Sequence, residues 1–522
     1  MLKKILNSRT LLVFTIPFLL GLLSVLSFQP FNITLINFLI IPIFFLIISD
    51  INKRSKNKYR KKPYLKNLFF AGYLFGIGFF LSGTHWISYS LTFDESLKIL
   101  IPFSIILIPL TLGLFFGLAF LIGGPFIKNN YSSFFLFCFI FSLIDYLRGN
   151  ILSGFPWNLW SYSWSWLVEI IQILNPIGLY AFNSISIVLF CAPVILLFNN
   201  RYKYFFFSVF LLIFFSLYIF GSYKINNNQK ISENIIKTAY TKVISPNFDM
   251  RYISSDNEIE ETIKKMVKYS EPDPKKETIF IWPEGIFAGV YFEDLKKFSN
   301  IFSKSFSKKH VIIFGINTKD KNTGKFYNSL IASNNELKVL YKYNKKKLVP
   351  FGEFIPLNNF FEKFGFKKIT QGYGSFSKGN KQNNFLINDL NIFPLICYEI
   401  IFPSLSQFAD EKTNMIINIS EDAWFGKSIG PFQHFTKAIY RSVEEGLFIA
   451  RSANKGISAF INPNGKIIKS LETGEPGNIR LNFPYFHQST LFSNYGNKIF
   501  FLIILLYIFL ILILKKTETS ND

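Results

Sequence analysis

Three stretches of this chain carry side chains that could do chemistry together, at 279–285, 343–356 and 397–399. Cys397 ends the run Asn391–Ile396, which is rich in β-formers and is typical of a buried strand that stops at a turn. Such a strand end can fix a thiol and expose it as a nucleophile. A free cysteine in an apolar run is, however, more often a small core residue. The thiol therefore needs partners elsewhere in the chain before it indicates catalysis.

Two further stretches could supply these partners. Glu284 follows the β-rich run 279–283, although a carboxylate after a strand is usually solvated or caps a helix. Lys345–Lys347 could be a solvated basic run. The stretch Leu348–Gly352 that follows is apolar and tightly turned, and Glu353 is embedded in it, which is not typical of a surface. A thiol, a carboxylate and an amine together would suit nucleophilic acyl chemistry.

The remaining thiols and the histidines indicate no other chemistry. Cys138 and Cys191 lie in long apolar blocks, where packing explains them, and 3 cysteines rule out a disulfide scaffold. An unpaired Cys397 facing an oxidising compartment is a liability unless it has a function. The 4 histidines are scattered and fit no ligand spacing. We expect no metal site and no cofactor.

Long apolar blocks dominate the chain up to about residue 221 and return near its end. A membrane-spanning helix needs roughly 20 mainly apolar residues. The sequence therefore predicts an integral membrane protein with about eight spans. These spans are 10–28, 34–49, 67–90, 98–123, 132–148, 175–198, 203–222 and 498–515.

Basic residues favour alternate loops between these spans, most densely in the loop 53–66. Because Lys and Arg concentrate in cytoplasmic loops, both termini are expected in the cytoplasm and the globular part on the far side of the membrane. The formal charge of +23 lies largely in this loop and at span ends. We assign it to topology and anionic headgroups, and expect no nucleic acid partner.

The globular part alternates strand and helix patterns, which favours a layered α/β domain. Strands are predicted at 278–282, 311–316, 329–332, 339–343, 393–397 and 415–419, with a hairpin of 456–462 and 467–471 around Asn464-Gly465. Helices are predicted at 258–269, 292–306 and 432–450.

Two aromatic stretches of the membrane part look like more than lipid-facing helix. Gly83–Leu91 places polar and aromatic groups at a span end, where an interfacial belt is common. Gly154–Trp157 continues into Trp160, Tyr162, Trp164 and Trp166. This second stretch could be a lipid-facing wall at headgroup depth or an interface anchor.

Taken together, these segments resemble the nitrilase superfamily, and more narrowly the apolipoprotein N-acyltransferases of bacterial inner membranes. The resemblance covers nearly the whole chain and depends on long, ordered motifs. They are Trp282-Pro-Glu284, Tyr343-x-Lys345-x-x-Leu-Val-Pro-Phe-Gly-Glu353, Cys397-Tyr-Glu399, Asp422-Ala-Trp-Phe-Gly426, Gly430-Pro-x-Gln-His434, Arg451-x-x-Asn454-x-Gly456 and the membrane Gly154-Phe-Pro-Trp157.

The resemblance implies a role for each motif residue. Glu284 would be the general base, Lys345 the triad lysine and Cys397 the nucleophile. Lys345 is preferred to its neighbours because it stands two residues after Tyr343 and eight before Glu353. The family also needs residues at the positions of Glu353, Tyr398 and Glu399 around the site. A thiolate attacks an ester well, and a Lys⁺ near the sulfur favours the thiolate.

The resemblance also implies substrates and a location. The acyl donor would be a membrane phospholipid, and the acceptor the α-amino group of the N-terminal S-diacylglyceryl-cysteine of an apolipoprotein, in a ping-pong reaction through a Cys397 thioester. The implied architecture is a transmembrane domain at 1–224, a nitrilase-like αββα catalytic domain at 225–497 in the periplasm, and a final span with a cytoplasmic tail at 498–522. The protein is expected to be a monomer in the bacterial inner membrane.

Two other functions remain open, and two segments depart from the family pattern. The chain could be a membrane-tethered hydrolase of the same superfamily, or a membrane protein whose nitrilase-like part only binds a partner. The family usually has Asn where this chain has Glu421, and Ser245–Tyr252 only loosely resembles the family's stretch. These departures concern lipid contacts rather than Glu284, Lys345 and Cys397.

Overall fold

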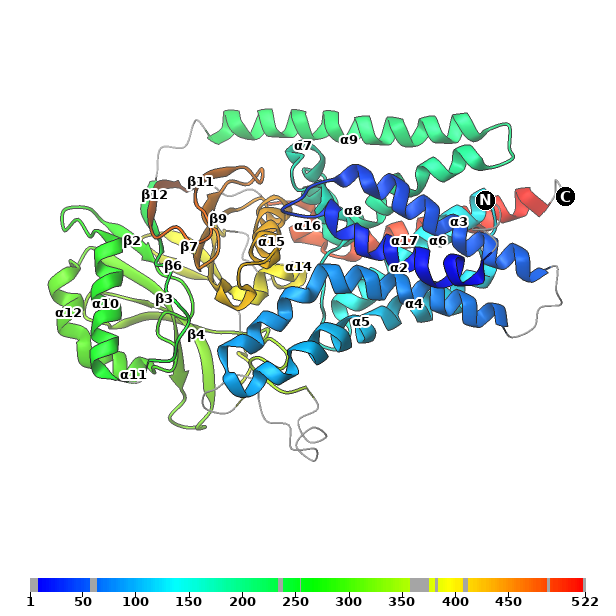
Figure 1. The fold of residues 1–522 in the computed structure, drawn as a ribbon. Coiled ribbons are helices and arrows are strands. Elements are labelled where there is room, and N and C mark those ends of the chain that lie inside the picture. The colour runs from blue at the N-terminus through cyan, green and yellow to red at the C-terminus, as the bar shows by residue number, and fades with distance from the viewer. Residues whose placement is uncertain are drawn as a thin grey trace. The chain divides into compact units, whose positions relative to one another are not determined.

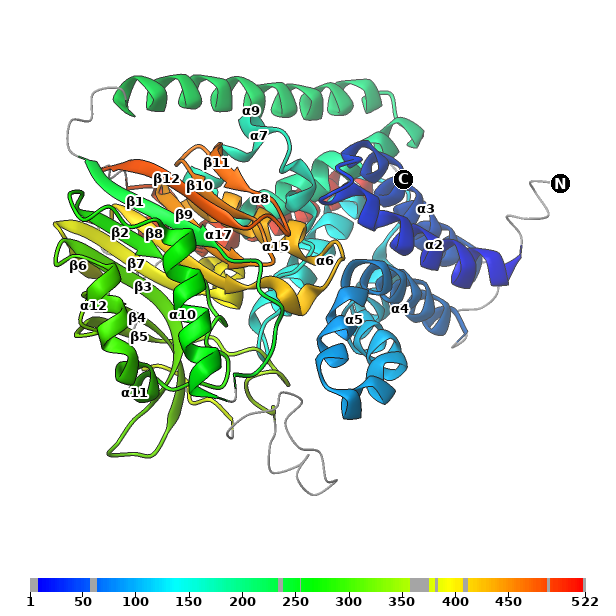
Figure 2. The ribbon, with the colours of Figure 1, turned by 60° about the vertical axis from the view of Figure 1, so that its left-hand side comes forward.

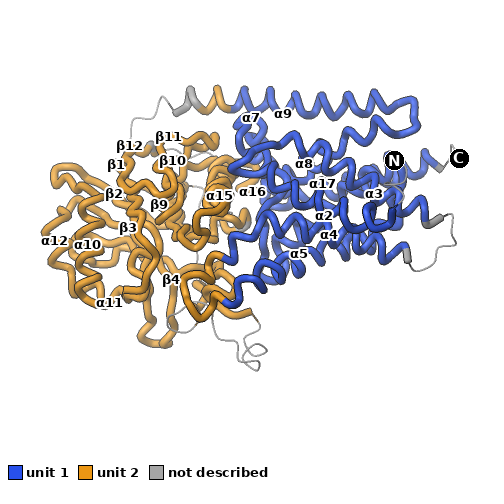
Figure 3. Tube along the Cα trace, viewed as in Figure 1, with its two compact units in different colours: residues 1–88, 99–224, 495–522 blue, residues 89–98, 225–494 orange. Residues whose placement is uncertain are grey.

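The fold is taken from a computed structural model that describes residues 8–56, 63–232, 238–253, 255–356, 375–380, 384–406, 412–485 and 489–519. The chain folds into two compact units (Figure 3). Unit 1 contains residues 1–88, 99–224 and 495–522, and unit 2 contains residues 89–98 and 225–494. The short segment 89–98 between two predicted spans thus belongs to the unit that contains the globular part.

Unit 1 is built from long apolar helices, labelled in Figure 1. Within the described residues, eight helices are long and apolar enough to cross a membrane, as the sequence predicts. Helix α4 packs against α2 and α5, and α6 packs against α8 and α17. The main helices are α2 (Ile16–Leu23, continuing a π-helical turn Thr10–Thr15), α3 (Asn37–Lys56), α4 (Pro63–Thr84), α5 (Ile101–Gly123), α6 (Tyr131–Asn150), α8 (Leu174–Cys191), α9 (Lys203–Ser232) and α17 (Lys498–Thr519).

The aromatic stretch after Gly154 is mostly buried, which corrects both readings of it as a lipid-facing or interfacial surface. Trp157, Trp160, Tyr162 and Trp164 are buried, and only Trp166 is substantially exposed. Trp160 lies among the rings of Phe28, Phe75, Phe79 and Phe141. The stretch therefore packs as core, because bulky rings gain more from mutual burial than from one lipid-facing contact.

A buried ion pair holds this aromatic stretch to helix α6. Arg148 donates to Asp145 at 2.9 Å and to the carbonyl oxygens of Phe155 and Trp157 at 2.6 and 2.7 Å. Asn183 on α8 donates to the second oxygen of Asp145 at 2.9 Å. Charges inside a membrane unit are costly unless they are paired in this way.

Unit 2 contains two six-stranded mixed sheets (Figure 2). The first has the order β12-β1-β2-β3-β4-β5 and the second β11-β10-β9-β8-β7-β6. The first sheet's strands are β1 (Thr238–Ser245), β2 (Thr278–Ile281), β3 (His310–Lys319), β4 (Phe326–Ser333), β5 (Val339–Asn344) and β12 (Gly477–Pro484). The second sheet's strands are β6 (Phe385–Ile387), β7 (Leu390–Ile396), β8 (Met415–Glu421), β9 (Phe448–Asn454), β10 (Ser458–Ile461) and β11 (Ile467–Leu471).

The sheets face each other across one apolar core, and helices cover their outer faces, giving the expected αββα layers. In β2, Ile279 and Ile281 point into the core between the sheets, where they meet residues such as Ile417 of β8. Phe280, on the opposite face of β2, packs under α10 (Asp256–Ser270) with Ile263. Alternate residues of one strand therefore serve two cores, as the period of a strand requires. On the second sheet, α15 (Gly430–Glu445) packs against β9 and β10.

The long helix predicted at 432–450 is wrong at its C-terminal end. Gly446 adopts φ +67° and ends α15, and residues from Phe448 onward form the central strand β9. The predicted helix 292–306 is broken into α11 (Phe292–Leu295), a 3-10 turn and α12 (Ser299–Ser305). The other predicted strands are present, with ends shifted by up to three residues.

Candidate active site

The predicted site residues come from strand ends in both sheets. Glu284 follows β2 and Lys345 follows β5 of the first sheet, while Cys397 follows β7 of the second. All three residues are buried. Gly315 of β3 lets the backbone of Glu284 approach, since an added Cβ would lie 2.8 Å from the Glu284 Cα. The two facing sheets thus bring together three side chains that are up to 113 residues apart in the sequence, the separation of Glu284 and Cys397.

Lys345 is the cation between two carboxylates. Its Nζ donates to Glu284 Oε1 at 3.2 Å and to Glu353 Oε1 at 3.0 Å. Burial lowers the pKa of Lys345, but the two carboxylates oppose this effect, and the resulting pKa is well above the ordinary value. The amine is therefore a permanent ammonium in this site.

Asn328 on β4 belongs to this network as well, and the sequence does not predict it. Its amide Nδ2 donates to Glu284 Oε1 at 2.6 Å and to Glu353 Oε1 at 2.8 Å. It thereby holds the same two oxygens that Lys345 contacts. An asparagine inside a strand carries no local sequence signal of this kind, because the contact arises from pairing between distant strands.

The apolar turn after Lys347 positions Glu353. Phe351 adopts φ +62°, and its N–H donates to the carbonyl oxygen of Phe354 at 2.7 Å. Glu353 Oε2 accepts from the Val349 N–H at 2.8 Å. The embedded carboxylate noted in the sequence thus folds back onto its own turn with one oxygen and reaches Lys345 with the other.

Cys397 lies at a strained turn at the end of β7. Its φ is +46°, which a residue with a Cβ adopts at a cost, typically at functional sites. Burial raises the pKa of the Cys397 thiol, the Glu284 carboxylate raises it further, and the Lys345 ammonium only partly opposes them. The resting group is therefore a protonated thiol, so a base must remove its proton during attack.

Glu399 fixes the turn that carries Cys397 to the loop that carries Lys345. Its Oε1 accepts from Tyr343 Oη at 2.8 Å and from the N–H groups of Lys346 and Lys347 at 2.7 and 3.0 Å. Its Oε2 accepts from the Ile396 N–H at 2.8 Å. Burial raises the pKa of Glu399, and these donors and Lys345 counter it. Its geometry is that of a positioning residue.

Tyr398 packs its ring against Phe402, with centroids 5.1 Å apart.

The polar residues of the Asp422, His434 and Arg451 motifs form one buried cluster. Asp422 accepts from Ser420 Oγ at 2.6 Å and from Arg451 Nη2 at 2.8 Å, and its Oδ1 lies 3.0 Å from His434 Nδ1. Burial alone would raise the pKa of Asp422, but Arg451 and His434 hold it well below the ordinary value. This cluster supports the turn after β8, at the same sheet edge as Cys397.

Glu421 is a second carboxyl beside Glu284. Its backbone N–H donates to Glu284 Oε2 at 3.1 Å, and its side chain accepts from Asn454 Nδ2 at 2.9 Å and from the Ala423 N–H at 3.0 Å. Gly285, at φ +80°, makes room for it, since an added Cβ would lie 2.4 Å from Glu421 Oε2. Burial raises the pKa of Glu421 well above the ordinary value, and Glu284 raises it further. The Glu421 carboxyl therefore keeps its proton to a higher pH than a solvated glutamate does.

Glu421→Gln is expected to stabilise the protein increasingly as the pH rises. In the unfolded chain the Glu421 carboxyl ionises near its ordinary pKa of about 4.3, whereas its pKa is raised in the folded protein, so folding becomes less favourable as the pH rises above about 4.3. Glutamine retains the acceptor oxygen without this cost. The melting temperature of E421Q minus that of the wild type should therefore be larger at pH 8 than at pH 5. The exposed Glu336→Gln serves as control, and a difference that shrinks with pH would contradict a protonated Glu421.

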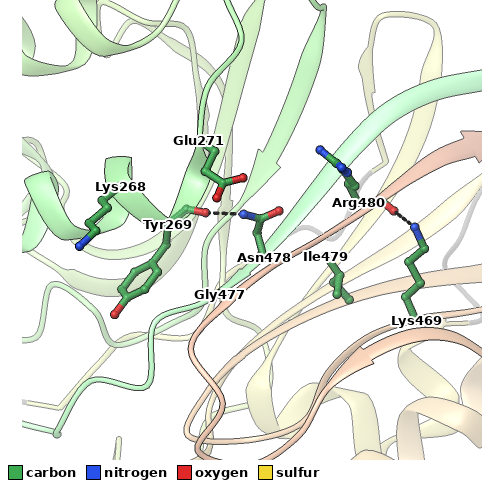
Figure 4. A pocket seen from close by; sticks show the side chains of 8 residues that line it. All are labelled: Lys268, Tyr269, Glu271, Lys469, Gly477, Asn478, Ile479 and Arg480. Atoms are coloured by element: carbon green, nitrogen blue, oxygen red, sulfur yellow. Dashed lines mark hydrogen bonds between the residues drawn. The ribbon is translucent and has the colours of Figure 1, made fainter.

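A surface hollow of about 550 Å³ lies elsewhere in unit 2 (Figure 4). It is lined by the end of α10 and by β11 and β12, and Asn478 donates to the carbonyl oxygen of Tyr269 at 2.8 Å across it. It contains none of the residues Glu284, Lys345 and Cys397. The hollow is therefore separate from the candidate active site.

Comparisons with known proteins place most of this chain in regions shared with characterised families. The sequence model of the family of apolipoprotein N-acyltransferase N-terminal domains matches residues 20–193. The sequence model of the carbon-nitrogen hydrolase family matches residues 255–480. The apolipoprotein N-acyltransferase of Rhodopseudomonas palustris is 29% identical over 97% of this chain and 96% of its own length. That of Rickettsia typhi is 32% identical over 95% and 96%, respectively. Nit3 of Saccharomyces cerevisiae, a solved nitrilase-superfamily structure, has a TM-score of 0.36 and 17% identity, covering 51% of this chain and 95% of its own. The chain belongs to the apolipoprotein N-acyltransferase family.

Proposed function

We propose that this protein transfers a fatty acyl chain from a membrane phospholipid to the α-amino group of the N-terminal S-diacylglyceryl-cysteine of apolipoproteins. The observation that carries the proposal is the buried ammonium of Lys345 held between Glu284 and Glu353, with electrostatic coupling to the Cys397 thiol. This site belongs to a chain with eight helices that are apolar enough to span a membrane among its described residues. Acyl chemistry and lipid substrates are therefore expected in one molecule.

In the first half-reaction, Cys397 Sγ attacks the ester carbonyl carbon while Glu284 takes the thiol proton. The protonated thiol of the resting site makes this base necessary. Lys345 and the N–H of Tyr398 face the oxyanion of the tetrahedral intermediate. The intermediate then breaks its C–O bond, and Glu284 returns the proton to the departing lysophospholipid oxygen. The enzyme is left as a Cys397 thioester.

In the second half-reaction, the acceptor amine attacks the thioester carbonyl. Glu284 takes a proton from the amine, the C–S bond breaks, and the thiol is restored by that proton, leaving an amide. Glu353, Tyr398 and Glu399 hold this machinery in place, through the Lys345 contact, the turn at Cys397 and the four hydrogen bonds of Glu399. The two halves use one base in both directions, as a ping-pong transferase requires.

We propose a transmembrane domain at 1–224, a periplasmic catalytic domain at 225–497 and a final span with a cytoplasmic tail at 498–522. Both termini are then cytoplasmic, which the basic loop 53–66 supports. The protein is proposed to act as a monomer.

Mass spectrometry of the purified protein incubated with phospholipid tests this function. We expect an acyl adduct on Cys397 that hydroxylamine removes and that a diacylglyceryl-cysteine peptide accepts as an amide. An adduct that decays only to free fatty acid, without peptide acylation, would favour the membrane-tethered hydrolase. The absence of any adduct would favour a protein that only binds a partner. Either outcome would contradict the transferase.

A further inference from the structure

Two more lysine side chains lie beside the candidate active site, and the mechanism above does not use them. Lys347 follows Lys345 by two residues, and Lys378 belongs to the segment 375–380. The two segments are in direct contact. The Gly379 N–H donates to the carbonyl oxygen of Lys345 at 2.9 Å, and an added Cβ on Gly379 would lie 2.1 Å from the Asn344 carbonyl oxygen. Only glycine permits this approach, so the segment places Lys378 next to the lysine run.

Each amine lies over an aromatic ring that is close to a residue of the site. The Nζ of Lys347 lies 4.9 Å from the centroid of the buried Phe402 ring, which itself packs against Tyr398 next to Cys397. The Nζ of Lys378 lies 5.6 Å from the centroid of the Phe354 ring, next to Glu353. Ring faces stabilise a cation without neutralising it. Both amines are thus oriented by the turns that carry Cys397 and Glu353.

The two amines repel each other, and neither forms an ion pair with a carboxylate of the described residues. Burial lowers the pKa of the partly buried Lys347, and Lys378 and Lys346 lower it further, while Glu399 opposes these effects only in part. In the part of the chain that the structure describes, neither Lys347 nor Lys378 makes a salt bridge. Glu399, the carboxylate that acts on Lys347, already accepts hydrogen bonds from Tyr343 and three backbone N–H groups. Like charges held together in this way favour an anionic ligand.

We infer that Lys347 and Lys378 bind the phosphate group of the phospholipid donor and so position its ester over Cys397. This inference depends on the proposed function, because it assigns a subsite for the donor of that reaction. Two facts of charge favour the donor over the acceptor. The phospholipid carries a phosphate diester, which lysine binds as a point charge. The acceptor carries an amine at its reacting end, and two ammonium groups would repel an ammonium form of it.

The test compares a phosphate-bearing donor with a phosphate-free one. Phosphatidic acid and diacylglycerol with the same acyl chains are presented to the full-length protein in identical detergent micelles. The rate of Cys397 thioester formation is measured by mass spectrometry over a range of donor concentrations. The wild type should prefer phosphatidic acid, and Lys347→Met with Lys378→Met should lower this preference about tenfold or more, through KM rather than kcat.

Two further variants separate the effect of the lysine charges from an effect on folding. The variant with Lys347→Arg and Lys378→Arg keeps both charges and should retain most of the preference. The variant with Lys325→Met and Lys338→Met removes two exposed lysines of the same unit and should behave as the wild type. Equal melting temperatures of all variants would show that the change arises at the site.

Each outcome has one meaning. If the wild type forms no thioester with either donor, the proposed function fails. If thioester forms but the double methionine variant keeps the wild-type preference, the phosphate subsite is wrong. If inorganic phosphate binds the wild type and not the methionine variant, while the donor preference is unchanged in both, the lysines bind a free anion and the donor assignment is overturned.

Discussion

Replacing Cys397 with serine is expected to lower the rate of acyl transfer at least about 10⁴-fold while leaving the protein folded. A serine hydroxyl is a much poorer nucleophile than a thiolate unless a strong base activates it, and Glu284 is a carboxylate that also contacts Lys345. The change is nearly isosteric. Ser420, whose hydroxyl interacts with the Cys397 sulfur, can hydrogen-bond the new hydroxyl. The melting temperature should therefore fall by no more than a few degrees.

Single-turnover transfer of a fluorescent acyl chain to a diacylglyceryl-cysteine peptide measures this loss. A matched control is the variant with Cys138→Ala and Cys191→Ala, which leaves Cys397 as the only thiol of the chain. Both control positions are buried in helices α6 and α8 of unit 1, and each substitution removes only the sulfur atom. This control should transfer the chain at close to the wild-type rate. Transfer by Cys397→Ser at close to the rate of this control would rule out Cys397 as the nucleophile.

Glu284 and Cys397 can be predicted from the sequence because each stands where an apolar strand stops. Lys345 can be predicted from its spacing to Tyr343 and Glu353 in the motif that resembles the family. A buried strand of four to eight residues and a polar residue at its end are local features of the sequence. They can therefore be recognised without knowing how the two sheets pack. The conformation that makes Cys397 unusual, with φ +46°, is not visible in the sequence, since a cysteine carries no preference for it. The protonated state of the Cys397 thiol is not visible in the sequence either, because it depends on burial in the folded protein.

Other features could not be predicted because distant contacts decide them. Residues 448–450 continue the apolar spacing of α15, yet Gly446 ends the helix and pairing with β8 and β10 makes Phe448–Asn454 a strand. Strand β1 pairs with β12, more than 200 residues away, and neither has a strong local pattern. The burial of Trp160 is equally nonlocal, because its neighbours Phe28, Phe79 and Phe141 come from three other segments.

Replacing Lys345 with methionine is expected to remove both activity and a large part of the stability. Lys345 is the one cation that contacts Glu284 and Glu353 in the described network, and both carboxylates also share Asn328. Without the ammonium, the buried Glu284 carboxylate and the partly buried Glu353 carboxylate face each other uncompensated, which costs about 3–5 kcal/mol. Loss of the oxyanion contact should also lower the rate of thioester formation about 10²–10³-fold. Thermal unfolding and single-turnover kinetics measure the two effects.

The double variant Lys345→Met with Glu353→Gln separates these two roles of Lys345. Removing one carboxylate along with the ammonium restores the charge balance, so the double variant should be more stable than Lys345→Met alone. It should stay as inactive, because the oxyanion still lacks its cation. The single variant Glu353→Gln leaves Lys345 paired with Glu284. It measures how much stability and activity are lost when the hydrogen bond from the Val349 N–H to the Glu353 carboxylate is weakened. Recovery of activity in the double variant would show that Lys345 serves the site through charge balance alone and makes no contact with the reacting oxygen.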